Sequence, residues 1–129
     1  MKKSGILNRH LSGALAQLGH TDLVVVCDIG LPIPQGPTVV DLAFRAGVPS
    51  FAEVLTGLVE ELEVEGAVAA AEVRQANPEC EALLESHFPG LELVPHEELK
   101  KLTRQARLVV RTGEARPYAN VALRCGVPF

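Results

Sequence analysis

Leu23-Val24-Val25-Val26-Cys27 is a continuous apolar run, rich in β-branched valine, near the start of a chain of 129 residues. A run this short, without alternating polar residues, is typical of a strand that is covered on both faces in a parallel sheet. Asp28 follows directly, so we expect its carboxyl group at the carboxyl end of that strand. In such sheets, functional groups collect in the loops beyond the carboxyl ends of the strands.

Helical and strand-like segments alternate on either side of this run. Apolar residues at helical spacing predict a helix that ends before Gly19. Ser50 and Glu53 form a capping-box pattern, and Asn77 before Pro78 marks another helix start, which we extend to about residue 86. We expect a last helix over 96–106, an irregular Pro- and Gly-rich loop over 29–37, a turn at 113–117, and strands over 38–44, 64–73, 91–94, 108–110 and 120–125.

This alternation predicts the fold class and the number of domains. Strands that alternate with helices favour a three-layer α/β/α fold with a largely parallel central sheet. The alanine-rich segment 64–73 leaves helix open as an alternative to strand. A chain of this length fits one domain, which we place over residues 1–129.

Composition and charge exclude several classes of protein. A net charge of -4, without a run of basic residues, disfavours binding to DNA or RNA. No segment is long and apolar enough to span a bilayer, and polar residues interrupt the apolar stretch that a signal peptide would need. Cys27, Cys80 and Cys125 are widely spaced and odd in number, so we expect reduced thiols and a cytoplasmic location.

His20 and Asp28 flank the predicted first strand and are chemically suited to act as an acid/base pair. A histidine titrates near neutrality, and a carboxylate partner can fix its tautomer. The fold rule alone does not bring the two together, and a meeting across a subunit boundary stays open. The residues by themselves favour a structural role for His20 as a helix-capping turn residue, and leave Asp28 evenly balanced between loop cap and functional group.

Two further sets of polar side chains could contact a polyol. His96 and Lys100 lie four residues apart on a predicted helix and share a face, although a solvated helix surface is the simpler interpretation. Tyr118 and Asn120 alternate at the entry to the last strand, so both could point the same way; a turn tyrosine at a sheet edge is equally plausible. His96-Glu97-Glu98-Leu99-Lys100 lacks the second histidine of a zinc-protease motif, so no metal site is predicted.

Five segments, in this order along the chain, resemble the D-ribose pyranase branch of the ribose pyranase / fucose mutarotase family. They are Gly19–Asp22, Val26–Pro34, Gly47–Phe51, His96–Lys100 and Pro117–Asn120. The resemblance covers essentially the whole chain. The L-fucose mutarotase branch is less similar, because it usually has Tyr-Gly-Asn where this chain has Tyr118-Ala119-Asn120, and its loop at 30–34 differs.

The resemblance implies an isomerase that converts β-D-ribopyranose to β-D-ribofuranose, the form that ribokinase phosphorylates, without a metal or organic cofactor. It implies His20 as the proton donor, and it matches Lys100 to a position that is basic in part of the family. The implied sugar-binding positions are Asp28, His96, Tyr118, Ala119 and Asn120. It also implies a homodecamer of two stacked pentameric rings with sites between neighbouring subunits. An L-fucose-type mutarotase and a non-catalytic ribose-binding regulatory subunit are the alternatives.

Overall fold

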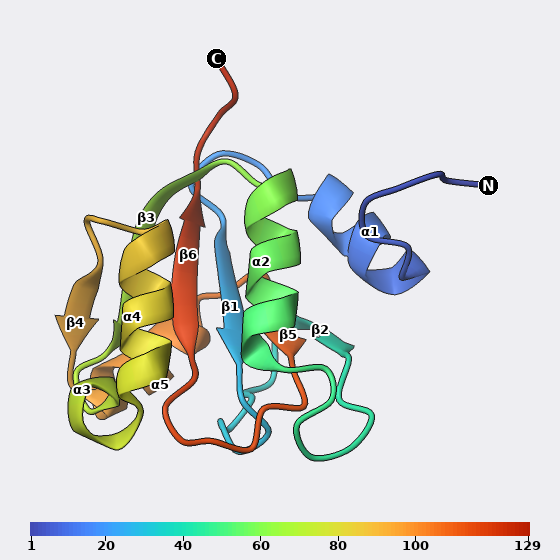
Figure 1. The fold of residues 1–129 in the computed structure, drawn as a ribbon. Helices are drawn as coiled ribbons and strands as arrows, with labels where there is room; N and C mark the ends of the chain where they lie inside the picture. Colours follow the sequence, from blue (N-terminus) through green and yellow to red (C-terminus); the bar gives the residue numbers. More distant parts are fainter.

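The computed structural model describes residues 1–129 and is built around a six-stranded sheet in the order β2-β5-β1-β6-β3-β4 (Figure 1). Strand β5 pairs in parallel with both β1 and β2, and β3 pairs in parallel with β4. The strands are β1 (Leu23–Cys27), β2 (Thr38–Asp41), β3 (Val64–Ala70), β4 (Glu92–Val94), β5 (Leu108–Arg111) and β6 (Val121–Cys125).

Strand β6 is antiparallel to both of its neighbours, β1 and β3 (Figure 1). Val121, its first residue, pairs with Val26 near the end of β1 and with Ala69 near the end of β3. The segment that leads into β6 therefore lies at the same edge of the sheet as the residues that leave β1 and β3. This reversal brings residues 118–120 to the edge where Asp28 lies.

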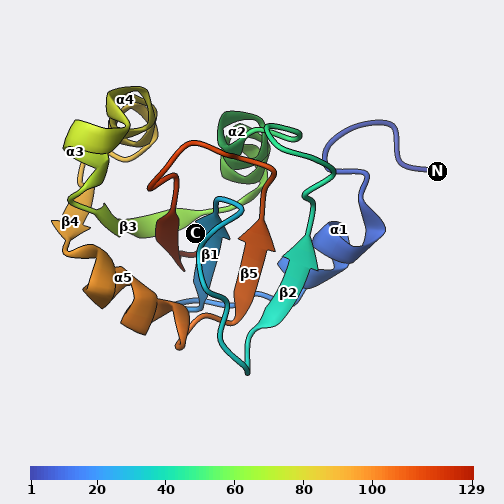
Figure 2. The same cartoon turned by 90° about the horizontal axis from the view of Figure 1, so that it is seen from below.

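Helices cover both faces of the sheet, as the predicted three-layer fold requires (Figure 2). On one face lie α2 (Phe51–Glu61) and α4 (Pro78–His87), with the short α3 (Val73–Ala76) beside α4; α5 (His96–Thr103) covers the other face. Helix α1 (Arg9–Ala16) packs beside β2 and adds Leu11 to the core under α2. None of these helices combines the length and the apolar character needed to cross a bilayer.

Strand β1 is buried on both faces, as its apolar run predicts. Val24 and Val26 point into the larger core beneath α2 and α4, whereas Val25 and Cys27 point into the smaller core beneath α5. All four side chains have no exposed surface. The alternation follows from the two-residue period of a strand, which sends successive side chains to opposite faces.

The predicted helix starts are confirmed. Ser50 and Glu53 form the capping box at the start of α2, with the Glu53 N–H donating to Ser50 Oγ at 3.1 Å. The Asn77 side chain accepts from the Cys80 N–H at 3.3 Å, and Pro78 is the first residue of α4.

Three predicted elements end earlier than expected. The strand predicted over 38–44 ends at Asp41, whose carboxylate accepts hydrogen bonds from Arg111 Nη1 at 3.0 and 3.2 Å. The strand predicted over 64–73 ends at Ala70, and Val73 already begins α3, so the helix alternative holds only for the last residue of that segment. The helix predicted over 96–106 ends at Thr103 and continues as tighter turns to residue 106.

Candidate active site

A cavity of about 280 Å³ opens at the carboxyl ends of β1 and β5 and the amino end of β6. The size lies at the small end of ligand pockets in proteins, so the cavity suits a small molecule. Four of the predicted site residues line it. The lining consists of Asp28, Ile29, Gly30, Leu31, His96, Glu114, Ala115, Arg116, Pro117, Tyr118 and Asn120.

Asp28 and Asn120 are joined by two hydrogen bonds in the cavity wall. Asn120 Oδ1 accepts from the Asp28 N–H at 2.9 Å, and Asn120 Nδ2 donates to Asp28 Oδ2 at 3.2 Å. The other Asp28 oxygen, Oδ1, accepts from the backbone N–H groups of Gly30 at 2.9 Å and Leu31 at 3.0 Å. A carboxylate oxygen accepts more than one hydrogen bond and an amide nitrogen donates two. Asp28 Oδ2 and Asn120 Nδ2 can therefore each bind a further hydroxyl group.

His96 and Tyr118 meet edge to face beside this pair. Their ring centroids lie 5.1 Å apart, with an angle of 87° between the ring planes. The backbone N–H of His96 donates to the Glu72 carboxylate at 3.1 Å, which anchors the first turn of α5. His96 Nδ1 is buried and has no hydrogen-bond partner within the chain. Leaving such a group unpaired costs about 1–3 kcal/mol, so a ligand hydroxyl at this atom would be stabilising.

Tyr118 has a left-handed backbone conformation, with φ at +57°. Residues other than glycine seldom adopt this conformation, and local strain of this kind clusters at functional sites. The preceding carbonyl, that of Pro117, accepts a hydrogen bond from Asn77 Nδ2 at 3.0 Å. This bond ties the strained turn to the start of α4 and helps to hold the tyrosine ring at the cavity.

Glu114 and Arg116 line the cavity as well, and the sequence-based prediction missed both. Glu114 is only 5% exposed and accepts hydrogen bonds from Arg116 Nε, the Arg116 N–H and the Phe51 N–H. Burial opposes ionisation of Glu114, but the bonds from Arg116 and Phe51 outweigh it and lower the pKa of this carboxyl group. Phe51 begins α2, far away in sequence, so no local pattern could have revealed this contact.

We expect Glu114→Gln to destabilise the fold by about 1–3 kcal/mol at neutral pH, because buried N–H groups lose a charged acceptor. The pKa of Glu114 is lower in the folded state than its ordinary value of 4.5. The ionised carboxylate therefore contributes its full stabilisation of the folded state at pH values above 4.5. The stabilisation is lost as the pH falls through the folded pKa. Urea unfolding should show a lower free energy of unfolding for the variant than for the wild type at pH 7, and this difference should disappear in acid.

The exposed Glu79 provides a matched control for this prediction. Its carboxylate accepts from Arg116 Nη1 at 2.6 Å, but its side chain is 83% exposed. Glu79→Gln should change the free energy of unfolding by about 0.5 kcal/mol or less. If the difference in the free energy of unfolding between wild type and Glu114→Gln stayed constant from pH 7 into acid, the role of the ionised carboxylate would be contradicted.

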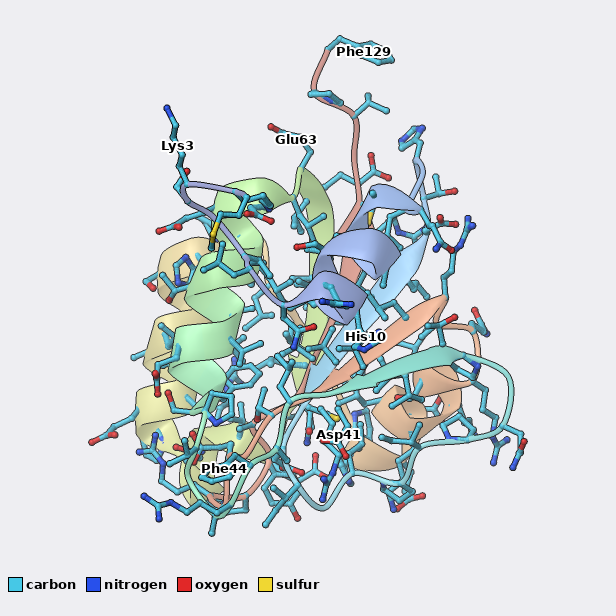
Figure 3. All side chains as sticks on the ribbon, turned by 90° about the vertical axis from the view of Figure 1, so that its right-hand side faces the viewer. Lys3, His10, Asp41, Phe44, Glu63 and Phe129 are labelled. Atoms are coloured by element: carbon cyan, nitrogen blue, oxygen red, sulfur yellow. The ribbon has the colours of Figure 1, made fainter.

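His20 lies at the opposite edge of the sheet from this cavity. It lines a separate cleft of about 440 Å³ between the carboxyl end of α2 and residues 125–128. Strand β1 separates His20 from Asp28, and its five residues span about 16 Å at the usual rise per residue. In Figure 3, Glu63 near the top marks the end of the sheet at the His20 cleft, and Asp41 in the lower half marks the end where β2 finishes. His20 and Asp28 therefore do not meet within one chain.

The turn that carries His20 is well anchored. Asp22 Oδ2 accepts from the Gly19 N–H at 2.8 Å and from Arg107 Nη1 at 2.9 Å, and these bonds lower the pKa of the Asp22 carboxyl group. The Thr21 N–H donates to the Cys125 carbonyl oxygen at 2.9 Å, and Thr21 has a φ of +71°. The imidazole itself is 51% exposed, with Nε2 lying 3.0 Å from Glu65 Oε2.

The thiols are not suited to nucleophilic chemistry at neutral pH. All three cysteines are free and buried. Burial raises the pKa of both Cys27 and Cys80 to about 12, and the nearby Asp28 and Glu114 carboxylates add to the respective shifts. The thiolate is the reactive form of cysteine, so these side chains serve the core. No three His, Cys, Asp or Glu side chains lie close enough together to hold a metal ion.

Comparison with known proteins identifies the family. Residues 1–128 match the model of the RbsD / FucU transport protein family. The chain belongs to this family. It is 75% identical over 129 residues to a D-ribose pyranase of Streptomyces avermitilis, and the match covers all of both chains. The resemblance predicted from the five sequence segments is thereby confirmed.

Two solved structures show the same fold. The structure of Bacillus subtilis RbsD complexed with D-ribose matches with a TM-score of 0.95 and 48% identity over the whole of both chains. A fucose mutarotase from Streptococcus pneumoniae, in complex with L-fucose, matches with a TM-score of 0.79 over 95% of each chain. At 18% identity, the second match supports the fold alone.

Two further predicted site residues, Lys100 and Ala119, contribute no side chain to the cavity. Lys100 Nζ donates to Glu97 Oε1 at 3.0 Å, and Lys100 does not line the cavity. Ala119 is buried in the larger core, so only its backbone could face a ligand. The cavity of one chain thus assembles Asp28, His96, Tyr118 and Asn120, without His20, Lys100 or the Ala119 side chain.

Proposed function

We infer that this protein is an isomerase that interconverts β-D-ribopyranose and β-D-ribofuranose. The observation that carries this inference is the convergence of Asp28, His96, Tyr118 and Asn120 on one small cavity. The relatives named D-ribose pyranase, at up to 75% identity over the full chain, indicate the substrate. The structure of a 48% identical relative complexed with D-ribose supports the same ligand class.

The cavity offers both acceptors and donors for sugar hydroxyl groups. Asp28 Oδ2 can accept a hydrogen bond from one hydroxyl, and Asn120 Nδ2 can donate to another. The unpaired His96 Nδ1 provides a third polar contact, beside the Tyr118 ring. Because Asp28 and Asn120 are already held by each other and by the 30–31 loop, little ordering is needed when a sugar binds.

Ring interconversion requires proton transfers and no other chemistry from the protein. A proton is delivered to the ring oxygen, the bond from this oxygen to the anomeric carbon breaks, and its electron pair stays on the oxygen. The anomeric hydroxyl loses its proton to a base, and an aldehyde forms. We propose Asp28 as this base, because the other carboxylate at the cavity, Glu114, is engaged by Arg116 and Phe51. A different hydroxyl then loses its proton as it attacks the aldehyde carbon, the carbonyl oxygen takes the proton back from Asp28 to become the new anomeric hydroxyl, and the other ring closes. General acid/base catalysis of this kind contributes about 10²–10⁴ in rate.

We propose His20 as the proton donor, acting in the cavity of a neighbouring subunit. His20 and Asp28 lie at opposite edges of one sheet, so a site that contains both requires two chains. Contacts of this kind, repeated head to tail, form a ring when the rotation between neighbouring subunits closes. This agrees with the decamer of two pentameric rings that the family resemblance implies. Exposed apolar side chains, such as Phe44 at 78% and Ile29 at the cavity rim, suit contact with another subunit.

We place the protein in the cytoplasm, where a ribokinase would consume the furanose form. The free, buried thiols of Cys27, Cys80 and Cys125 are in keeping with a reducing compartment. The resemblance implies that the reaction needs no bound cofactor, and we propose the same for this protein.

Saturation-transfer NMR of D-ribose tests the proposed activity. We expect magnetisation to pass between the pyranose and furanose signals faster with the protein than in buffer alone. L-Fucose, measured in parallel, should show a smaller acceleration. Binding of ribose by calorimetry, with ring exchange no faster than in buffer, would instead support a non-catalytic binding subunit. Faster exchange with L-fucose than with D-ribose would favour the mutarotase alternative.

A further inference from the structure

Glu65 is held against His20 by an irregularity in strand β3. The pairing of β3 with β6 shifts register between Val64 and Gly66, so Glu65 lies in a bulge. A β-bulge redirects the side chain of the extra residue, and bulges are frequent beside active sites. Here, the Glu65 carboxylate lies 3.0 Å from Nε2 of His20, a residue 45 positions earlier in the chain.

The contact determines which nitrogen of His20 carries the hydrogen. An ionised carboxylate only accepts hydrogen bonds, so Nε2 must be the donor to Glu65. In the neutral imidazole, the free lone pair then belongs to Nδ1. His20 Nδ1 has no hydrogen-bond partner within the chain, and the side chain is 51% exposed. Nδ1 is therefore the nitrogen that a ligand in another subunit can reach.

No other carboxylate makes this contact. Glu60, Glu61 and Glu63 line the same cleft as His20, but none of them bonds to its ring. Glu61 Oε1 instead accepts from the Ile6 N–H at 2.8 Å. Asp22, two residues from His20, is engaged by Gly19 and Arg107, and no Lys or Arg lines the cleft. Glu65 thus makes a specific hydrogen bond with His20, whereas the carboxylates that line the cleft make no bond to the ring.

We propose that Glu65 is a positioning residue that holds His20 as the Nε2–H tautomer, so that Nδ1 exchanges the proton with the sugar. This inference rests on the proposed ribose isomerisation. The protonated imidazole gives its Nδ1 proton to the ring oxygen as the bond to the anomeric carbon breaks. When the new ring closes, Nδ1 takes a proton from the attacking hydroxyl, so His20 is regenerated. The Nε2–H bond to Glu65 persists throughout.

The kinetic test compares Glu65→Gln and Glu65→Ala with the matched control Glu63→Gln, which removes an equal charge from the cleft that His20 lines. We expect both Glu65 variants to lower kcat for ring exchange about 10- to 100-fold, a part of the gain from general acid/base catalysis. KM should change less than about twofold, because no sugar contact is lost. Glu65→Asp should recover part of the rate. Rates for Glu65→Gln equal to those for Glu63→Gln would overturn the proposal.

A second readout does not depend on activity. The chain contains four histidines, so selective ¹⁵N labelling of histidine gives few signals, and loss of one set in His20→Gln assigns His20. Neutral His20 should carry its hydrogen on Nε2 in the wild type and become a mixture of tautomers in Glu65→Gln. An Nδ1–H tautomer in the wild type would overturn the inference. If wild type fails to accelerate ribose exchange, the proposed function fails, whereas an active enzyme with the wrong tautomer refutes only the role of Glu65.

Discussion

His20→Ala is expected to lower the rate of ribopyranose–ribofuranose exchange by about 10²–10⁴, the range that a positioned general acid contributes. The loss should appear in kcat, because the residues proposed to bind the sugar stay intact. Saturation-transfer NMR with purified variant measures it directly. The imidazole is half exposed and makes one side-chain hydrogen bond, so the fold should be unaffected.

His10→Ala is the matched control for this experiment. His10 is exposed on α1 and lines neither the cavity nor the His20 cleft (Figure 3). Its replacement should leave both the exchange rate and the unfolding temperature unchanged. A His20→Ala variant that keeps the full exchange rate would refute the assignment of His20 as proton donor.

Co-expression of His20→Ala with Asp28→Asn is expected to restore activity that neither variant shows alone. A mixed contact combines an intact His20 from one chain with an intact Asp28 from the other in one of its two orientations. With random assembly and one neighbour per site, roughly a quarter of the sites should be complete. Asp28→Asn is chosen because the remaining carbonyl oxygen can still accept the Gly30 and Leu31 N–H bonds.

Separate tags on the two variants allow the mixed oligomer to be purified and assayed by ribose exchange. Co-expression of His20→Ala with a His20→Ala/Asp28→Asn double variant is the control, and it should restore nothing because no chain supplies His20. Recovery in the first mixture and not in the second demonstrates a site shared between chains. Absence of recovery in a verified mixed oligomer would contradict the two-chain site.

Much of the secondary structure follows from local sequence patterns. The apolar run at 23–27 is a buried strand, and the caps at Ser50 and Asn77 begin helices where predicted. These features depend on neighbouring residues, since strand burial, capping and helical spacing are local effects. The errors lie at element ends. Strand β2 stops at Asp41, where the carboxylate accepts from the Ala43 N–H at 3.0 Å and from Arg111 of the paired strand β5. Arg111 is 70 residues away in sequence, so the local pattern could not reveal this second partner.

The candidate site could be predicted as a set of residues but not as an arrangement. The five matching segments named Asp28, His96, Tyr118 and Asn120, and all four line one cavity. The contacts between them depend on β6, which runs antiparallel to β1 and β3 in the middle of the sheet. Strand direction is set by how the chain returns to the sheet, which composition and periodicity do not record.

The sequence alone determined the fold class, the family and the residue types available for acid/base chemistry, because these follow from periodicity, capping and motif order along the chain. The tertiary structure decided which of those residues meet. It placed Asp28 beside Asn120, added the buried Glu114 to the cavity wall, and put His20 with Glu65 at the opposite edge. The physical reason is that a five-residue strand separates His20 and Asp28 in space, although only seven residues lie between them in sequence.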